Sequence, residues 1–263
     1  MEVIIRPDRL SAVDLTVRLI EKRLRDKPDL VLGLATGRTM EAVYAGLVAS
    51  GVSFARCRTF NLDEYIGLPA TNPNSYAHYM HTHLFSKVDI DPANTHLPYG
   101  MAPDLKLAAR EYEDRIAAAG GIDLQLLGIG QAGHIGFNEP LSALMSRTRD
   151  KSLTPATRQQ NAGMFGGDAQ AVPSRALTMG VGTILEAREL LLLACGAAKA
   201  GVIASAVEGP LTSRVSASAI QLHPSCKVVL DDDAAAELTG REYYDFVFSN
   251  EPEWAEFREE TDR

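Results

Sequence analysis

The chain has 263 residues, with 34 acidic and 26 basic side chains and a formal net charge of −8. Hydrophobic residues make up 46% and charged residues 23%, a composition typical of soluble globular proteins rather than of disordered ones. The acidic balance argues against a nucleic-acid-binding protein, whose affinity rests on many phosphate contacts. It does not exclude a small anionic ligand, because a local group of donors can bind an anion on an acidic protein.

The sequence also bears on the compartment. The three cysteines are an odd number without C-x-x-C spacing, which is typical of free thiols in a reducing environment. The first residues lack the basic and long apolar regions of a signal peptide. Residues 190–207 are apolar apart from one lysine, but Gly196 and Lys199 divide them into a strand-length and a helix-length piece. We therefore expect a cytoplasmic protein without a membrane partner.

Short apolar runs alternate with segments of helical period along the chain. The first helix is expected over 11–27, with Ser11 as its N-cap and Pro28 as its stop. The expected strands are 3–6, 30–35, 58–62, 124–129, 189–194 and 227–230, and the other helices are 40–50, 76–85, 105–119 and 197–208. Buried strands that each precede a helix predict a single-domain, Rossmann-like α/β fold with a mainly parallel sheet and helices on both faces. Residues 142–172 are polar and lack a period, so we expect an excursion or lid there.

Ligands of open parallel sheets bind beyond the carboxyl ends of the strands, where four loops are candidates. The loop 33–39 leads into a helix, so its backbone N–H groups can hold a phosphate, although such a turn is often only structural. The loop 196–199 puts Lys199 in a first helical turn, where it opposes the helix dipole unless an anion binds there. The candidate phosphate-binding residues are Thr36, Gly37, Arg38, Thr39 and Lys199.

The other two loops carry candidate acid–base residues. Asp63 and Glu64 follow a strand, and one of them is a candidate general base; the alternative is that one caps the next segment while the other is solvated. In the loop 127–140, glycines surround His134, and Asn138 and Glu139 follow closely, which favours a catalytic over a structural histidine.

Three histidines within the segment 76–85 suggest a metal site at first sight. His78 and His81 share a helical face, but His83 does not complete a metal-ligand spacing. The sequence therefore predicts no metal site.

Several of these strings together resemble the glucosamine-6-phosphate deaminases. The resemblance covers about residues 31–223, and its motifs occur in the family's order: N-L-D-E-Y at 61–65, G-I-G at 128–130, G-H-I-G-F-N-E-P at 133–140, S-R-T-R at 146–149 and G-V-G-T at 180–183. The related 6-phosphogluconolactonases share the G-x-G-x-x-G-H string but diverge after its histidine, so they fit less well.

The resemblance implies conversion of glucosamine 6-phosphate and water to fructose 6-phosphate and ammonia, without a metal or redox cofactor. It implies that His134 opens the sugar ring, that Asp63 moves a proton from C2 to C1, and that Glu139 orients the histidine. The phosphate-binding elements of the family match residues 36–39 and Lys199.

Two positions depart from the family pattern. Ala132 stands where the family commonly has Asp or Asn, and Gly163 stands where it has an arginine that holds the phosphate. Arg38 lies where the family usually has a small residue, so we hypothesise that it supplies the missing guanidinium. A different amino-sugar substrate, a non-catalytic sugar-phosphate sensor of the same fold, and lactone hydrolysis or simple isomerisation remain alternatives.

Arg149 and Lys151 match residues that bind N-acetylglucosamine 6-phosphate as an activator in hexameric members of the family. The alternative is a solvated basic stretch. A homo-oligomer is therefore only a general expectation, and the sequence does not define its size.

Overall fold

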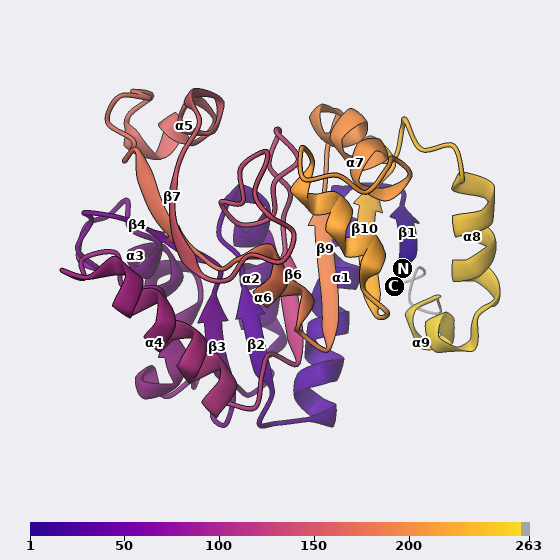
Figure 1. Cartoon of the computed structure of the whole chain (residues 1–263). Coiled ribbons are helices and arrows are strands. Elements are labelled where there is room, and N and C mark those ends of the chain that lie inside the picture. Colours follow the sequence, from indigo (N-terminus) through magenta and orange to yellow (C-terminus); the bar gives the residue numbers. More distant parts are fainter. Residues whose placement is uncertain (259–263) are drawn as a thin grey trace.

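A seven-stranded parallel sheet forms the centre of the computed structural model, which describes residues 1–258 (Figure 1). Its strands, in spatial order, are β1 (Glu2–Arg6), β10 (Cys226–Asp231), β9 (Glu189–Ala194), β6 (Leu124–Leu127), β2 (Val31–Leu34), β3 (Arg58–Asn61) and β5 (Thr95–His96). The α-helices are α1 (Arg9–Asp26), α2 (Arg38–Ser50), α3 (Tyr76–Met80), α4 (Leu105–Ala118), α5 (Pro155–Asn161), α6 (Val181–Leu185), α7 (Ala200–Val207), α8 (Arg241–Asn250) and α9 (Ala255–Arg258).

Helices cover both faces of this sheet (Figure 1). The strands β9 and β10 are buried along their whole length, because apolar side chains on both strand faces pack under helices. On one face α1 and α2 pack against each other, and on the other face Tyr112 of α4 packs against Phe60 of β3. The predicted Rossmann-like, single-domain α/β fold is confirmed.

A second, three-stranded antiparallel sheet was not predicted. Its order is β4 (Asp63–Tyr65), β8 (Arg175–Thr178) and β7 (Arg149–Ser152). Residues 142–172, expected to be irregular, contain β7, α5 and a 3-10 turn, and this part projects beyond the carboxyl ends of the main strands (Figure 1). The sheet therefore carries α5 to the side of the molecule where a ligand is expected.

Several predicted boundaries were wrong, among them those of three helical segments. The first helix begins at Arg9, because the carboxylate of Asp8 accepts the Ser11 N–H at 2.8 Å and caps the helix three residues early. The segment 76–85 is one α-helical stretch to Met80 followed by a π-helical turn, His81–Phe85. The segment 197–208 begins with a 3-10 turn, Ala197–Lys199, and becomes α-helical at Ala200.

The predicted free thiols are confirmed, since Cys57, Cys195 and Cys226 form no disulfide. Within residues 1–258, none of the helices has the length and hydrophobicity needed to span a bilayer. The apolar run 190–207 is split between β9 and α7 as expected.

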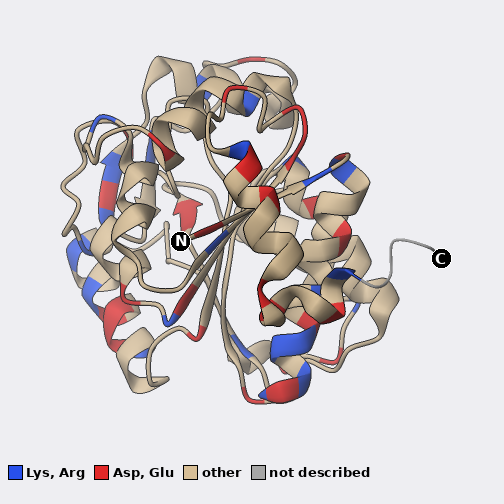
Figure 2. Ribbon diagram, turned by 90° about the vertical axis from the view of Figure 1, so that its right-hand side faces the viewer, with Lys and Arg blue, Asp and Glu red and all other residues tan. Residues whose placement is uncertain are grey.

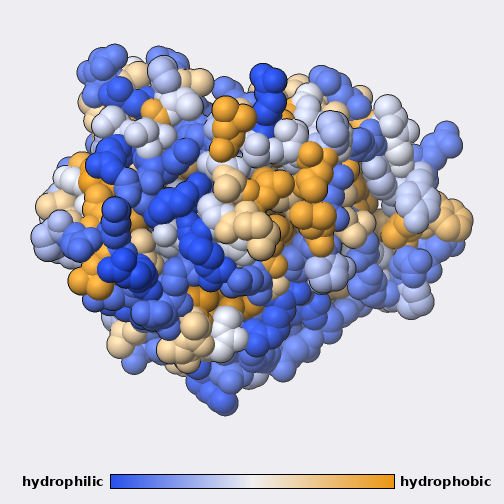
Figure 3. Space-filling view, viewed as in Figure 1, coloured by the Kyte–Doolittle hydropathy of each residue, from blue (hydrophilic) through white to orange (hydrophobic). Residues whose placement is uncertain are grey.

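The surface is mixed in polarity and charge. Acidic and basic residues are interspersed along the helices seen in Figure 2. On the face shown in Figure 3, hydrophobic residues form patches among hydrophilic ones, including one near the centre of the view.

Candidate active site

Loops beyond the carboxyl ends of β2, β3, β6 and β9 enclose a cavity of about 710 Å³. All four predicted loops contribute to its wall, as the position of ligands in open parallel sheets requires. The wall contains Thr36, Gly37, Arg38, Thr39, Asp63, His134 and Lys199. Glu139, Arg149 and Lys151 are not among the residues that line it.

Asp63 reaches the cavity from β4 and is only 6% exposed. Burial and then the negative charge of Glu64 raise the pKa of Asp63 to about 7, although hydrogen bonds from the Phe137 N–H and the Thr178 hydroxyl oppose this. A carboxyl group with such a pKa can both accept and donate a proton near neutral pH. The expectation that one carboxylate of the Asp-Glu pair is solvated was wrong.

Glu64 is also buried, and its carboxylate does not enter the cavity wall. It accepts hydrogen bonds from the N–H groups of Tyr65 at 2.8 Å, Tyr76 at 2.9 Å and Ala77 at 2.8 Å. The last two belong to the first turn of α3, so Glu64 supports this helix N-terminus, and the capping alternative for one of the two carboxylates is confirmed.

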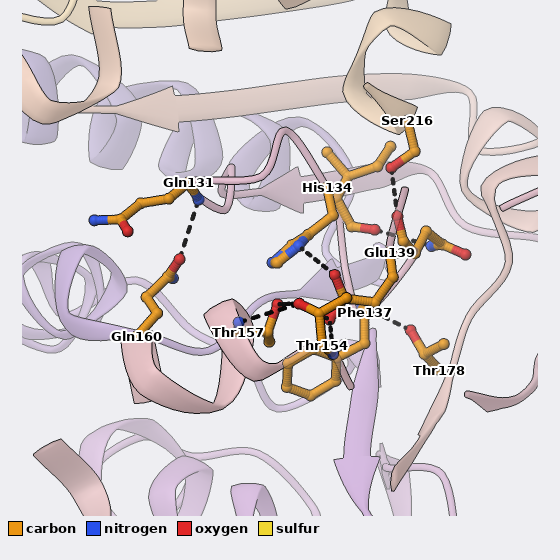
Figure 4. A network of polar contacts seen from close by, with 11 residues as sticks. Gln131, His134, Phe137, Glu139, Thr154, Thr157, Gln160, Thr178 and Ser216 are labelled. Atoms are coloured by element: carbon orange, nitrogen blue, oxygen red, sulfur yellow. Dashed lines mark hydrogen bonds and ion pairs between the residues drawn. The ribbon is translucent and has the colours of Figure 1, made fainter. Parts of the chain in front are cut away.

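His134 faces Glu139, with their Nδ1 and Oε2 atoms 3.4 Å apart (Figure 4). The other carboxylate oxygen of Glu139 accepts the Thr154 N–H at 3.0 Å and its hydroxyl at 3.3 Å. Burial alone would raise the pKa of Glu139, but hydrogen bonds from His134, Thr157 and Thr154 hold it below its usual value. Glu139 is therefore an anionic group held against the imidazole from behind the cavity wall.

Glycine is required beside the imidazole. A Cβ atom at Gly130 would overlap the imidazole ring of His134. Gly136 has a φ of +54°, and a Cβ there would lie 3.4 Å from a carboxylate oxygen of Asp63. The glycines around His134 thus let the backbone approach both acid–base side chains.

Asn138 anchors the loop between these residues. Its buried amide donates to the carbonyl groups of Ile135 and Met179, each at 2.9 Å, and accepts from Arg149 Nη1 at 2.8 Å. The Ser216 hydroxyl donates to the Asn138 carbonyl at 2.7 Å. Arg149 is therefore connected to the loop that carries His134 and Glu139 even though it lies on β7, outside the cavity.

The part of the cavity wall at the start of α2, which we call the cationic end, contains Arg38, Lys199 and one acidic residue, Glu41. Arg38 is the first residue of α2 and follows Gly37, whose φ of +127° suits glycine. The Lys199 ammonium group donates to the Ile129 carbonyl at 2.6 Å. Burial and the positive charge of Arg38 lower the pKa of Lys199, so the two cations lie close enough to interact. Two cations beside a helix N-terminus favour an anion at this end.

The sequence did not point to several residues of the cavity wall. Gln160, Asn161 and Met164 reach it from α5 and the turn that follows, and Tyr76 reaches it from α3. Gln160 accepts the Gln131 N–H at 3.0 Å, which connects α5 to the histidine loop (Figure 4). Only the polar character of residues 142–172 gave a signal, and it did not distinguish these positions.

The two departures noted in the sequence lie in different places. Gly163 lines the cavity, and a Cβ atom there would meet no other atom within 4 Å. Ala132 is half-buried and precedes His134 by two residues, outside the wall. Gly163 thus leaves room at the edge of the cavity.

Within residues 1–258, no group of three His, Cys, Asp or Glu side chains is arranged to hold a metal ion. His83 instead packs against the Tyr79 ring, with centroids 4.4 Å apart.

Known proteins with similar sequences span nearly the whole chain. A family model described as glucosamine-6-phosphate isomerases/6-phosphogluconolactonase matches residues 9–229. The glucosamine-6-phosphate deaminase of Hahella chejuensis is 49% identical over 95% of this chain and 96% of its own. That of Streptomyces coelicolor is 45% identical over 97% of this chain and 99% of its own.

Solved structures of the same family have a similar fold. A monomeric glucosamine-6-phosphate deaminase superposes with a TM-score of 0.87 at 40% identity, over 90% of this chain and 100% of its own. The 6-phosphogluconolactonase of Trypanosoma cruzi, with a TM-score of 0.74 and 19% identity over 90% of this chain and 97% of its own, shares the fold. By its sequence and its fold, the chain belongs to the family of glucosamine-6-phosphate isomerases and 6-phosphogluconolactonases.

Proposed function

We propose that this chain is a glucosamine-6-phosphate deaminase, which converts glucosamine 6-phosphate and water to fructose 6-phosphate and ammonia. The observation that carries the proposal is one cavity whose wall combines a buried carboxyl group of pKa about 7, a histidine that faces a carboxylate, and two cations. Relatives at 45–49% identity over nearly the full chain carry this name. The reaction cleaves a C–N bond with water and isomerises an aldose to a ketose.

His134 opens the sugar ring in this proposal. Ring opening needs a proton moved between the ring oxygen and the C1 hydroxyl, and an imidazole carries protons near neutral pH. Glu139, anionic and 3.4 Å from Nδ1, orients the ring and stabilises its protonated form. Thr154 supports this carboxylate in turn.

Asp63 then removes the proton from C2 and delivers it to C1. The electron pair of the C2–H bond forms a C1=C2 double bond while the carbonyl oxygen at C1 takes up a proton, which gives an enolamine. Protonation of C1 by Asp63 then draws the nitrogen lone pair into a C2=N bond and leaves an imine at C2. Water adds to the imine and ammonia leaves, which gives the ketone. A pKa of about 7 suits a group that must take up this proton and release it again.

The substrate phosphate lies at the cationic end. The N–H groups at the start of α2, the side chains of Thr36 and Thr39, and the ammonium group of Lys199 are its donors. Arg38 adds a guanidinium, and Gly163 offers no side chain for this contact. We propose that Arg38 replaces the arginine expected at position 163.

An ammonia-release assay tests this function. Purified protein is given glucosamine 6-phosphate, galactosamine 6-phosphate or unphosphorylated glucosamine, and ammonia is measured through a coupled dehydrogenase. Rapid release from glucosamine 6-phosphate supports the proposal. Binding without release would instead indicate a sensor, and preference for another sugar would reassign the substrate. No observation here favours either alternative.

Three further proposals concern the surroundings of the site. Residues 142–172 act as a lid, since α5 supplies part of the cavity wall. Arg149 and Lys151, two residues apart on β7, bind a phosphorylated effector.

The protein works in the cytoplasm. Light scattering with and without a phosphorylated sugar would measure self-association, whereas the similar solved deaminase is described as monomeric.

A further inference from the structure

Glu64 is a buried carboxylate beside the cavity that the proposed chemistry does not use. It is 4% exposed and adjoins Asp63 in β4, where consecutive side chains point to opposite sides of the strand. Asp63 faces the cavity, whereas Glu64 faces the N-terminus of α3. Burial of two neighbouring carboxylates reduces the stability of the folded state, so other contacts must compensate for the burial of Glu64.

The contacts of Glu64 join segments that are distant in sequence. Its Oε1 accepts the N–H groups of Tyr65 and Tyr76, and its Oε2 accepts that of Ala77. These bonds close the loop 66–75 onto β4, because Tyr65 precedes that loop and Tyr76 follows it. Tyr76 lines the cavity, so the position of this wall depends on Glu64.

The charge of Glu64 also acts on Asp63. Three backbone N–H donors favour its ionised form, although burial raises the pKa of Glu64. The titratable groups around Asp63 are Glu64 on the same strand, Tyr65 beside it, Tyr76 of α3, Tyr112 of α4 and His134 across the cavity. Of these, the negative charge of Glu64 favours a proton on Asp63.

We propose that Glu64 is a positioning residue for Asp63: its buried carboxylate ties α3 to β4 and sets a fixed negative charge behind the base. The role in catalysis rests on the proposed function. Asp63 must hold the substrate proton between C2 and C1, and a neighbouring anion makes that protonated state more accessible at neutral pH. Glu64 itself touches no substrate.

The test is the titration of Asp63, followed by carboxyl-carbon NMR, in the parent protein and in Glu64→Gln. Spectra of Asp63→Asn and Glu64→Ala assign the two signals. Glu64→Gln keeps the size of the side chain and removes the charge, so the Asp63 midpoint should fall by about one pH unit. The acid limb of the kcat/KM profile should move down with it. Asp104→Asn is the matched control, because it removes an exposed capping charge at the start of α4 and keeps an acceptor there.

Glu64→Asp separates charge from reach. It keeps the anion, so the Asp63 midpoint should stay near that of the parent, while the shorter side chain loosens the hold on Tyr76 and raises KM. If Glu64→Gln does not fold, the parent protein still decides, since Glu64 must titrate below Asp63 for its charge to act there. A Glu64 signal that titrates above Asp63, or an Asp63 midpoint equal in the parent, Glu64→Gln and Asp104→Asn, would overturn the inference.

These results are separable from the proposed function, because the titration needs no substrate. A shifted midpoint in a protein that releases no ammonia would leave the coupling between the two carboxylates standing and refute the deaminase. Ammonia release with an unshifted Asp63 midpoint would support the deaminase and refute the coupling between the two carboxylates.

Discussion

Replacement of Arg38 is the sharpest test of how the cavity holds a phosphate. Arg38 and Lys199 lie close enough that the charge of Arg38 lowers the pKa of Lys199. A charge-assisted hydrogen bond contributes about 1.5–3 kcal/mol, and Arg38 is exposed, so the lower part of this range applies. Arg38→Ala should therefore raise KM for glucosamine 6-phosphate about 10- to 30-fold, since 1.4 kcal/mol corresponds to a factor of ten.

The effect should fall on KM rather than on kcat. The phosphate does not change during the reaction, so its contact stabilises the bound substrate and the transition state alike. Arg25→Ala is the matched control, since it removes one exposed arginine paired with Glu21 on α1, away from the cavity wall. Steady-state ammonia release by both variants gives the comparison.

Gly163 offers a rescue of the same contact. A side chain at this position enters open space at the cavity, so Gly163→Arg in the Arg38→Ala background should lower KM again. An unchanged KM in Arg38→Ala would refute the reasoning outright. A raised KM without rescue by Gly163→Arg would restrict the phosphate contact to the α2 side of the cavity.

Three further predictions concern the acid–base end of the cavity. The pKa of Asp63 is about 7 in the folded state and near 4 in the unfolded state, so the folded state binds more protons between these pH values. The free energy of unfolding therefore falls as the pH rises through this range. Asp63→Asn should abolish ammonia release, yet it should raise Tm relative to the parent protein by more at pH 8 than at pH 5. Gly130→Ala should lower kcat at least tenfold with a folded circular dichroism spectrum, because its Cβ displaces the His134 ring. Arg149→Met removes the partner of the Asn138 amide oxygen and should cost about 1–3 kcal/mol in urea unfolding, whereas an unchanged midpoint would mean that Arg149 does not support the loop.

The main sheet was predictable because its strands carry their own signal. The run Glu189–Ala194 was expected at these residues and found there, since a short apolar run that ends before a glycine is typical of a strand buried on both faces. The second sheet was not, because β4 reads D-E-Y and β7 reads R-D-K-S. Strands this short and charged form here because β8 pairs with both of them, and this pairing depends on the tertiary structure.

The site was predictable where chain position fixes geometry. Parallel strands bring their carboxyl ends to one edge, so the loops holding Asp63, His134 and Lys199 had to meet. The part played by Glu64 depends on α3, twelve residues away, and that of Gln160 depends on how β7 carries α5 back over the sheet. No local sequence pattern predicts either of these contacts, because each joins segments that are distant in the sequence.

The net charge of −8 says little about the ligand, because binding depends on the groups that line the cavity, where the cations Arg38 and Lys199 share the wall with Glu41 and Asp63. Its cations, Arg38 and Lys199, lie near the start of α2, whereas Asp63 and Glu139 are buried and accept hydrogen bonds. We expect a sugar phosphate to place its phosphate at Arg38 and Lys199, away from the carboxyl group of Asp63. The cationic end therefore determines orientation as well as affinity. Unphosphorylated glucosamine should show a lower kcat as well as a higher KM, because no phosphate contact fixes its C2 carbon against Asp63.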